Sequence, residues 1–152
     1  MTIGICSGYF QRLHDGHKKY IRTAMDLFEY VIIIINNDIQ QKKKYENFEN
    51  IRSSQEISDE IFEQSIPWGK FRIITSIDCD ESVCETLKLI RSLYPSASLY
   101  FCKDGDRNKK NIPETKILRK ARIKYINFFN PKIDSAAEIM KKENDCEIQN
   151  IK

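Results

Sequence analysis

The chain has 152 residues, of which 41% are hydrophobic, so it can build one domain around one core and needs no second domain. Its net charge of +3 demands neither a nucleic-acid nor a membrane partner, and its longest apolar run, Val31 to Ile35, is too short to span a bilayer. The five cysteines form no CxxC pair, and the first residues lack the basic and apolar regions of a signal peptide, so we expect a cytoplasmic protein with reduced thiols.

Apolar segments with strand character alternate along the chain with amphipathic segments of helical spacing. This alternation predicts an α/β domain in which a doubly wound parallel sheet carries helices on both faces. In chain order, the first half is expected to form a strand (3–6), a helix (16–29), a buried strand (30–35), a mobile polar loop (40–52) and a helix (53–64). The second half is expected to form a strand (71–75), a helix (81–94), a strand (97–102), a helix (113–121), a strand (123–129) and a helix that opens near Ser135. We expect the domain to occupy residues 1–142 and to be followed by a disordered polar tail, 143–152.

Two histidines, His14 and His17, lie three residues apart where the first strand gives way to the first helix. The free N–H groups and the positive dipole end of a helix start favour an anion, and Gly8 and Gly16 allow backbone and ligand to approach closely. The pattern therefore predicts a phosphate-binding site. One alternative is structural: one histidine caps the helix and the other packs beside the loop. A zinc site is the other alternative, but it lacks a spaced cysteine or acidic partner.

A second polar turn follows the strand expected at 97–102. Gly105 supplies backbone freedom there, and Asp106 could accept hydrogen bonds from a ribose or a base. Because the carboxyl ends of parallel strands meet at one edge of a sheet, we expect this turn and the histidines to face one crevice. The alternative is a plain polar turn.

The stretch Gly8-Tyr9-Phe10-Gln11-Arg12-Leu13-His14-Asp15-Gly16-His17 resembles the signature of the HxGH nucleotidylyltransferases, in their cytidylyltransferase-like branch. The resemblance continues in the same order through Asn36-Asn37-Asp38, Lys44-Tyr45, Arg52, Gly105-Asp106-Arg107 and Asp134-Ser135. In these features the chain is similar to glycerol-3-phosphate cytidylyltransferases and sugar-phosphate adenylyltransferases. The resemblance implies a Rossmann-like domain that transfers a nucleoside monophosphate from its triphosphate to a phosphate acceptor and releases pyrophosphate. It also implies Mg²⁺ as the cofactor and a homodimer as the assembly.

The same resemblance implies roles for individual residues. The catalytic residues would be His14, His17 and Lys44, and no metal would be held by the histidines. The nucleotide would contact Gly8, Tyr9, Phe10, Gly16, Asp106, Arg107 and Ser135, with Gln11, Arg52 and Lys132 as secondary candidates. Without the resemblance, the lysine run 42–44 is typical of a solvated loop, and Arg52 could equally be a surface residue at a helix start.

Two departures from the family pattern leave the activity open. Gln11 stands where many members have an aspartate, which removes a charge beside the first histidine. The stretch Lys132-Ile133-Asp134-Ser135-Ala136-Ala137 stands where related cytidylyltransferases carry an arginine followed by isoleucine, serine and two threonines. Hydroxyl groups are lost there and a carboxylate is gained.

Three functions follow as hypotheses. The first is Mg²⁺-dependent transfer of CMP from CTP to a small phosphorylated or phosphonylated alcohol or sugar. The second is adenylyl transfer from ATP to a sugar phosphate such as a heptose phosphate, because the Gly105 turn also resembles that branch. The third is a catalytically silent nucleotide-binding module. Nucleic-acid binding is not expected, because the lysines are not interleaved with a stacking array of aromatic residues.

Overall fold

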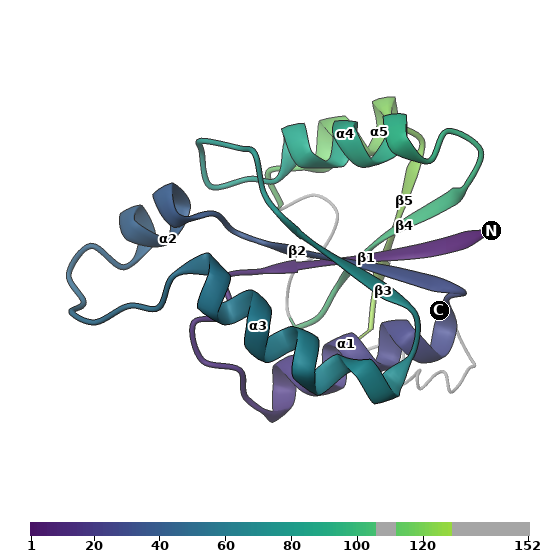
Figure 1. The fold of residues 1–152 in the computed structure, drawn as a ribbon. Coiled ribbons are helices and arrows are strands. Elements are labelled where there is room, and N and C mark those ends of the chain that lie inside the picture. The colour runs from purple at the N-terminus through teal and green to yellow at the C-terminus, as the bar shows by residue number, and fades with distance from the viewer. Residues whose placement is uncertain (106–111, 129–152) are drawn as a thin grey trace.

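The computed structural model describes residues 1–105 and 112–128, which form a layered α/β unit (Figure 1). Five strands form one parallel sheet in the order β3-β2-β1-β4-β5. The strands are β1 (Thr2–Gly8), β2 (Tyr30–Ile35), β3 (Phe71–Thr75), β4 (Ser98–Lys103) and β5 (Ile123–Asn127). The chain starts in the centre of the sheet, builds outward through β2 and β3, and then adds β4 and β5 on the other side of β1. This is the doubly wound, Rossmann-like topology that the sequence predicts.

Helices cover both faces of the sheet. They are α1 (Asp15–Leu27), α2 (Asp38–Lys44), α3 (Ser54–Ser65), α4 (Cys84–Leu93) and α5 (Thr115–Lys120), with a short 3-10 turn at Ile66–Trp68. Figure 1 shows α1 and α3 against one face and α4 and α5 against the other, with α2 beyond the end of β2. Within the described residues, no helix has both the length and the apolar character to cross a membrane.

Strand β2 shows why the sheet is buried on both faces. Its side chains alternate between two core layers: Ile32 and Ile34 belong to the layer that contains Leu87 of α4, and Ile33 belongs to the layer that contains Ile21 of α1. The five side chains from Val31 to Ile35 are completely buried. Burial of each of these side chains stabilises the folded state by roughly 1.5–3 kcal/mol, which explains the uninterrupted apolar run of this strand.

The expectation of a loop over residues 40–52 is wrong for residues 40–44, because α2 extends to Lys44. Asn37 caps this helix: its side chain accepts a hydrogen bond from the backbone N of Gln40 at 2.9 Å, and the Gln40 side chain accepts one from the backbone N of Asn37 at 3.1 Å. Gln40 and Gln41 are buried. Polar side chains that are buried through hydrogen bonds leave no trace in the apolar periodicity from which helices are predicted.

Other expected boundaries shift by a few residues. The first strand is longer at both ends (2–8), α1 ends at Leu27, α5 is shorter (115–120), and β5 ends at Asn127. Helix α4 begins only at Cys84, where the carboxylate of Asp78 accepts hydrogen bonds from the backbone N atoms of Glu85 at 2.7 Å and Thr86 at 3.0 Å. The helix expected near Ser135 and the tail 143–152 lie outside the described residues. The cysteines of the described part, Cys6, Cys79, Cys84 and Cys102, are unpaired.

Candidate functional site

A cavity of about 950 Å³ lies at the carboxyl ends of β1, β2 and β4. Ser7 and Gly8 line it at the end of β1, Asn36 lines it after β2, and Lys103 and Asp104 line it at the end of β4. The rest of the wall comes mainly from the β1–α1 loop, the segment after α2, and the segments before α4 and α5. Open α/β sheets bind their ligands at this edge, so the predicted crevice is present.

His14 is the N-cap of α1. Its Nδ1 accepts a hydrogen bond from the backbone N of His17 at 3.3 Å, so the neutral imidazole carries its proton on Nε2. The two imidazole rings stack, with 3.7 Å between their centroids and 18° between their planes. The structure therefore bears out the capping role of one histidine, and this role leaves Nε2 of His14 as a donor for a ligand.

His17 is half-buried beside the ring of Phe10, which meets it edge-on at a centroid distance of 5.0 Å. Burial lowers the pKa of His17, the neighbouring His14 lowers it further, and a hydrogen bond with the backbone of Arg12 opposes both effects. Nδ1 of His17 is buried and has no hydrogen-bond partner among the described residues. A buried polar atom of this kind is rare in native proteins, and here it belongs to a residue that lines the cavity.

The lowered pKa of His17 predicts how stability depends on pH. The unfolded chain protonates His17 near its ordinary pKa of 6.5, whereas the folded protein does so only at lower pH. Below about pH 6.5 the unfolded state binds more protons, so the free energy of unfolding should fall as the pH drops from there through the lowered pKa. Urea unfolding of the wild type and of His17→Gln, from about pH 7.5 to pH 5, measures this effect. The loss should be smaller in the variant, and equal losses in both proteins would contradict the assignment.

The two glycines of this region make room for side chains of the site. A Cβ at position 8 would lie 2.8 Å from the ring of Phe10, and a Cβ at position 16 would lie 2.9 Å from Cε1 of His14. Phe10 has a positive φ of 53°, which is strained for a bulky residue. The two glycines therefore do allow a close approach. In this structure the side chain of Phe10 lies against Gly8, and the side chain of His14 lies against Gly16.

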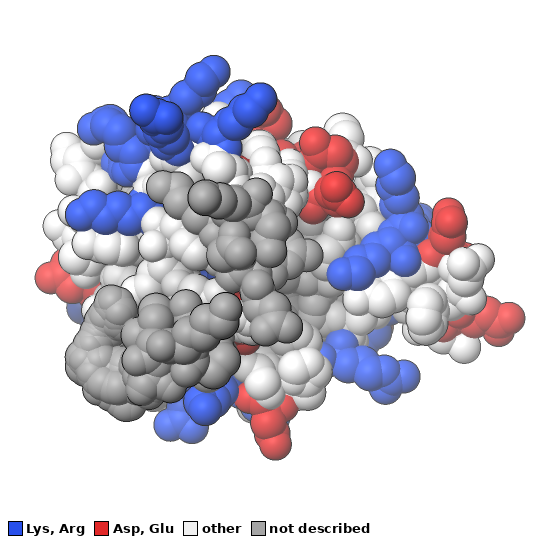
Figure 2. Space-filling view, turned by 180° about the vertical axis from the view of Figure 1, so that it is seen from behind, with Lys and Arg blue, Asp and Glu red and all other residues white. Residues whose placement is uncertain are grey.

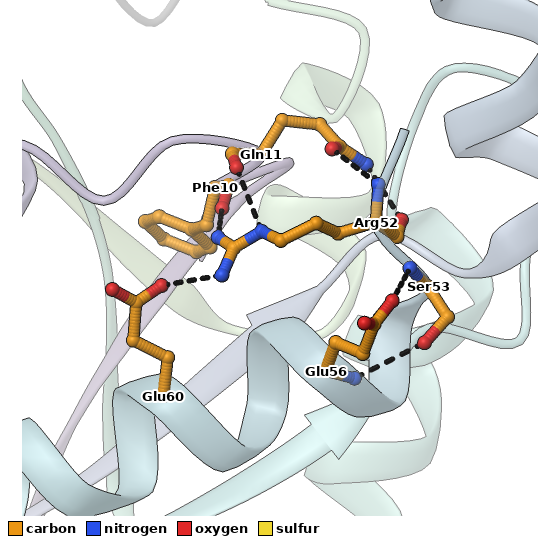
Figure 3. A network of polar contacts seen from close by, with 6 residues as sticks. All are labelled: Phe10, Gln11, Arg52, Ser53, Glu56 and Glu60. Atoms are coloured by element: carbon orange, nitrogen blue, oxygen red, sulfur yellow. Dashed lines mark hydrogen bonds and ion pairs between the residues drawn. The ribbon is translucent and has the colours of Figure 1, made fainter. Parts of the chain in front are cut away.

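Arg52 lies in the segment before α3 and binds the β1–α1 loop, which contains the strained Phe10 (Figure 3). Its Nη2 donates to the carbonyl oxygen of Phe10 at 3.1 Å, and its Nε donates to the carbonyl oxygen of Gln11 at 3.0 Å. Its Nη1 forms an ion pair with Glu60 of α3 at 2.6 Å. Arg52 lines the cavity, but these contacts tie its guanidinium to the protein. It is a positioning residue for the β1–α1 loop, rather than the plain surface residue considered as an alternative.

Gln11 pairs with the backbone of Arg52 in both directions. Its Nε2 donates to the Arg52 carbonyl at 2.8 Å, and its Oε1 accepts from the Arg52 backbone N at 2.9 Å. Nε2 also donates to Oε1 of Gln41 at 3.0 Å. Both bonds from Nε2 need a donor, which an aspartate at position 11 would not have. The departure from the family pattern at this position therefore fits the packing of this chain.

Gln41 binds the β1–α1 loop at a third residue, Tyr9, in addition to the two bound by Arg52. This role was not predicted from the sequence. Its side chain is fully buried, and its Nε2 donates to the carbonyl oxygens of Tyr9 at 2.8 Å and Asn36 at 3.1 Å. Gln41 and Arg52 thus hold the carbonyls of Tyr9, Phe10 and Gln11 in succession. The available signal was a pair of glutamines, 40 and 41, directly after a strand in an otherwise charged stretch.

Lys44 is the last residue of α2 and lines the cavity. Its Nζ lies 4.1 Å from the centroid of the Tyr9 ring and 5.8 Å from that of the Tyr45 ring, which are cation–π distances. Lys42 and Lys43 are exposed and are not among the lining residues. The structure therefore brings one lysine of the predicted run, Lys44, to the site together with the histidines.

Replacing Lys44 with methionine is expected to raise the KM for the nucleoside triphosphate by about 10-fold, because a charged donor to phosphate is worth roughly 1.5–3 kcal/mol. Lys42→Met removes the same charge from an exposed position outside the cavity and should change KM less than about twofold, since its charge is screened by salt. Initial rates of pyrophosphate release against triphosphate concentration measure both values. An equal rise in KM in the two variants would show that the overall charge of the protein causes the effect, and not a contact of Lys44 with the triphosphate.

Two further polar residues of the cavity wall lie at the end of β4. Nζ of Lys103 donates to Oγ of Ser7 at 3.0 Å, which joins the ends of β4 and β1. Burial raises the pKa of Asp104, and Lys103 opposes this shift. Of the predicted nucleotide contacts in this part of the chain, Asp106, Arg107, Ser135 and Lys132 lie outside the described residues. Within residues 1–105 and 112–128, no group of three His, Cys, Asp or Glu side chains is placed to hold a metal ion.

The surface seen from behind carries both signs of charge (Figure 2). Lysine and arginine side chains gather along its upper edge, on the side where Figure 1 places α4 and α5, and acidic side chains lie beside them. The segment from α5 into β5 contributes exposed basic residues, namely Lys116, Arg119, Lys120, Arg122 and Lys124. This mixed surface accords with the small net charge of the chain.

A doubly wound parallel sheet, a cavity at the carboxyl ends of its strands and a histidine pair at the start of the first helix define a Rossmann-like protein of the nucleotide-binding class. The chain belongs to the cytidylyltransferase-like family, whose sequence profile matches residues 5–145. Membership of this family indicates a nucleotidyltransferase.

The chain is also similar to individual proteins. The chain is 22% identical over 116 residues to a phosphopantetheine adenylyltransferase of Rubrobacter xylanophilus, an alignment that covers 66% of this chain and 71% of the relative. Its fold is similar to that of a lipopolysaccharide core biosynthesis protein from Thermoplasma volcanium, with a TM-score of 0.59, 16% identity, and coverage of 84% of this chain and 95% of the other. A protein of unknown function from Archaeoglobus fulgidus is similar with a TM-score of 0.50, 16% identity, and coverage of 84% and 88%. At these identities the two solved structures show the fold alone.

Proposed function

We propose that the protein transfers CMP from CTP to a small phosphorylated or phosphonylated alcohol or sugar and releases pyrophosphate. The observation that carries the proposal is the stacked pair of His14 and His17 at the start of α1, in one cavity with Lys44. A helix start with two imidazoles and a lysine is a set of hydrogen-bond donors suited to a triphosphate. The description of the family as cytidylyltransferase-like supports CTP as the donor.

The chemistry of nucleotidyl transfer suits these residues. A phosphate or phosphonate oxygen of the acceptor attacks the α-phosphorus in line, a new P–O bond forms, and the bond between the α-phosphorus and the bridging oxygen breaks as pyrophosphate leaves. Negative charge then spreads over the non-bridging and leaving oxygens. Nε2 of His14, the imidazole of His17 and the ammonium of Lys44 would stabilise that charge, so the protein positions the reactants and needs no covalent intermediate.

Magnesium is part of the proposal as the companion of the triphosphate. Mg²⁺ commonly binds through substrate phosphates and one or two carboxylates and keeps several waters. Mg²⁺ as the companion of the triphosphate rests on the family resemblance. The nucleotide contacts proposed for Asp106, Arg107 and Ser135 rest on the family resemblance, as does the homodimer.

A second candidate is adenylyl transfer from ATP. The relative from Rubrobacter xylanophilus is an adenylyltransferase, and the Gly105 turn resembles that of sugar-phosphate adenylyltransferases. Both candidates share the histidine chemistry and differ in the base and in the acceptor. The third hypothesis, a silent module, shares only the binding of the nucleotide.

Pyrophosphate release tests the proposal. CTP, ATP, GTP and UTP are each incubated with Mg²⁺ and with glycerol 3-phosphate, sugar 1-phosphates, a phosphonate and 4′-phosphopantetheine as separate acceptors. Release that depends on CTP and on an acceptor, and that His17→Ala lowers by about 100-fold or more, supports the proposal, whereas the same result with ATP selects the second candidate. Nucleotide binding in calorimetry without release from any pair would replace both with the silent module.

A further inference from the structure

Glu114 is a buried carboxylate for which the site described above has no use. It immediately precedes α5 and is 4% exposed. Its Oε2 accepts a hydrogen bond from the backbone N of Val83, the residue before α4, at 2.9 Å. Its Oε1 is buried and has no hydrogen-bond partner among the described residues. A buried carboxylate oxygen without a donor is costly, so a donor from outside the protein would explain it.

Glu114 also lines the cavity that contains the histidines. Pro113 precedes it in the chain, Val83 is its hydrogen-bond partner, and both are lining residues, as is Glu81. Lys44 at the end of α2 and Lys103 at the end of β4 also line the cavity. Phosphate groups therefore suit the two lysines, and a group that donates hydrogen bonds suits Glu114.

Sheet order indicates which substrate faces Glu114. Glu81 and Val83 follow β3, and Asn36, also in the cavity wall, follows β2. Both strands lie on the opposite side of β1 from β4 and β5. The turn expected to contact the nucleotide, which begins at Gly105, follows β4. Glu114 itself lies between β4 and β5 in the chain, but its hydrogen bond to Val83 joins it to the segment that follows β3, which we assign to the acceptor.

The geometry points to Glu114 as a specificity residue that binds a hydroxyl group of the acceptor, and this inference rests on the proposed function. The acceptor is thereby narrowed to phosphorylated or phosphonylated polyols and sugars. An ammonium group brings three donors and would also suit Glu81, so phosphoethanolamine is one of the probes in the test below. One hydroxyl donates one hydrogen bond, which would give Oε1 of Glu114 its missing donor. A hydrogen bond to a charged acceptor also gives strong discrimination against analogues that lack the donor.

Calorimetric binding of matched probes tests the inference without requiring turnover. The pairs are glycerol 3-phosphate with propyl phosphate, and glucose 1-phosphate with cyclohexyl phosphate, in which only the hydroxylated member can donate to Glu114. We expect the wild type to bind the hydroxylated member of at least one pair about 10- to 100-fold more tightly, as for other hydrogen bonds to charged groups. Discrimination below about twofold in both pairs would overturn the inference, whether or not any variant folds.

Glu114→Gln separates recognition from structure. The amide oxygen can still accept from Val83, so the thermal midpoint should stay close to that of the wild type, but the charge and one acceptor are lost. We expect the discrimination to fall to about threefold or less, whereas Glu85→Gln, which removes an exposed charge nearby and outside the cavity, should leave it unchanged. An unchanged ratio in Glu114→Gln, or tight binding of phosphoethanolamine that Glu114→Gln weakens, would overturn the inference. Absence of pyrophosphate release in the separate assay would count against the proposed function alone.

Discussion

The variant His17→Ala is expected to lower kcat for nucleotidyl transfer by about 10²- to 10³-fold and to change the KM for the triphosphate much less, since a donor aimed at developing charge acts in the transition state. His17 stacks on His14 at the start of α1, and its buried Nδ1 has no hydrogen-bond partner in the described part of the protein. Burial and the neighbouring His14 lower the pKa of His17, so its imidazole is neutral near pH 7 in the protein without ligand. Pyrophosphate release at saturating triphosphate and acceptor measures the change.

His14 needs a control of a different kind, because it also caps α1. His14→Ala should lower kcat, and it should also lower the free energy of unfolding by about 0.5–2 kcal/mol because the helix cap is lost. His14→Asn should keep the cap, since the amide oxygen can accept a hydrogen bond from the backbone N of His17. It should nevertheless lower kcat by about the same factor as His14→Ala. Urea unfolding and steady-state rates of both variants separate the two roles. Recovery of the rate in His14→Asn would show that His14 acts only through the helix.

The second large effect is expected from Arg52→Ala, which should lower the free energy of unfolding by about 2–4 kcal/mol. The substitution removes the donors to the Phe10 and Gln11 carbonyls and leaves Glu60 without its ion pair. Phe10 then loses a contact that holds its positive φ, and the loop that carries His14 is released. We therefore also expect a drop in kcat of about 10- to 100-fold, because His14, the proposed catalytic group, would be misplaced. Urea unfolding and saturating rates measure the two effects.

Two further variants test whether the loss of stability in Arg52→Ala comes from its hydrogen bonds to the β1–α1 loop. Arg119→Ala removes an exposed arginine of α5 and should change stability by less than about 0.5 kcal/mol. Gln11→Glu keeps the size of the side chain but loses both donors, to the Arg52 carbonyl and to Gln41, so it should destabilise the protein by about 1–3 kcal/mol. If Arg52→Ala raised the KM for the triphosphate and left kcat and stability intact, Arg52 would be a phosphate ligand and not a positioning residue.

Different parts of the site differ in how far sequence could predict them. His14 and His17 are recognisable because their chemistry is local: a helix start, two nearby glycines and a strand that ends at the ligand-binding edge. Lys44 could be placed only through the family resemblance, since a lysine run after a strand is typical of a solvated loop. Gln41 was missed altogether, because a buried glutamine is indistinguishable in sequence from an exposed one. The roles of Asp106, Arg107, Lys132 and Ser135 stay predictions.

The fold class, the sheet type and the sheet edge that carries the cavity could be predicted from the sequence alone. These features follow from apolar periodicity and from the rule that parallel strands end at a common edge, and both are written locally along the chain. Tertiary packing decides how the loop that carries the histidines is held, and it places Glu114 in the cavity wall. Gln11 meets Arg52 across 41 residues, and Glu114 meets Val83 across 31. Hydrogen bonds between such distant polar groups depend on where the packed elements place them, and they leave no periodic pattern in the sequence.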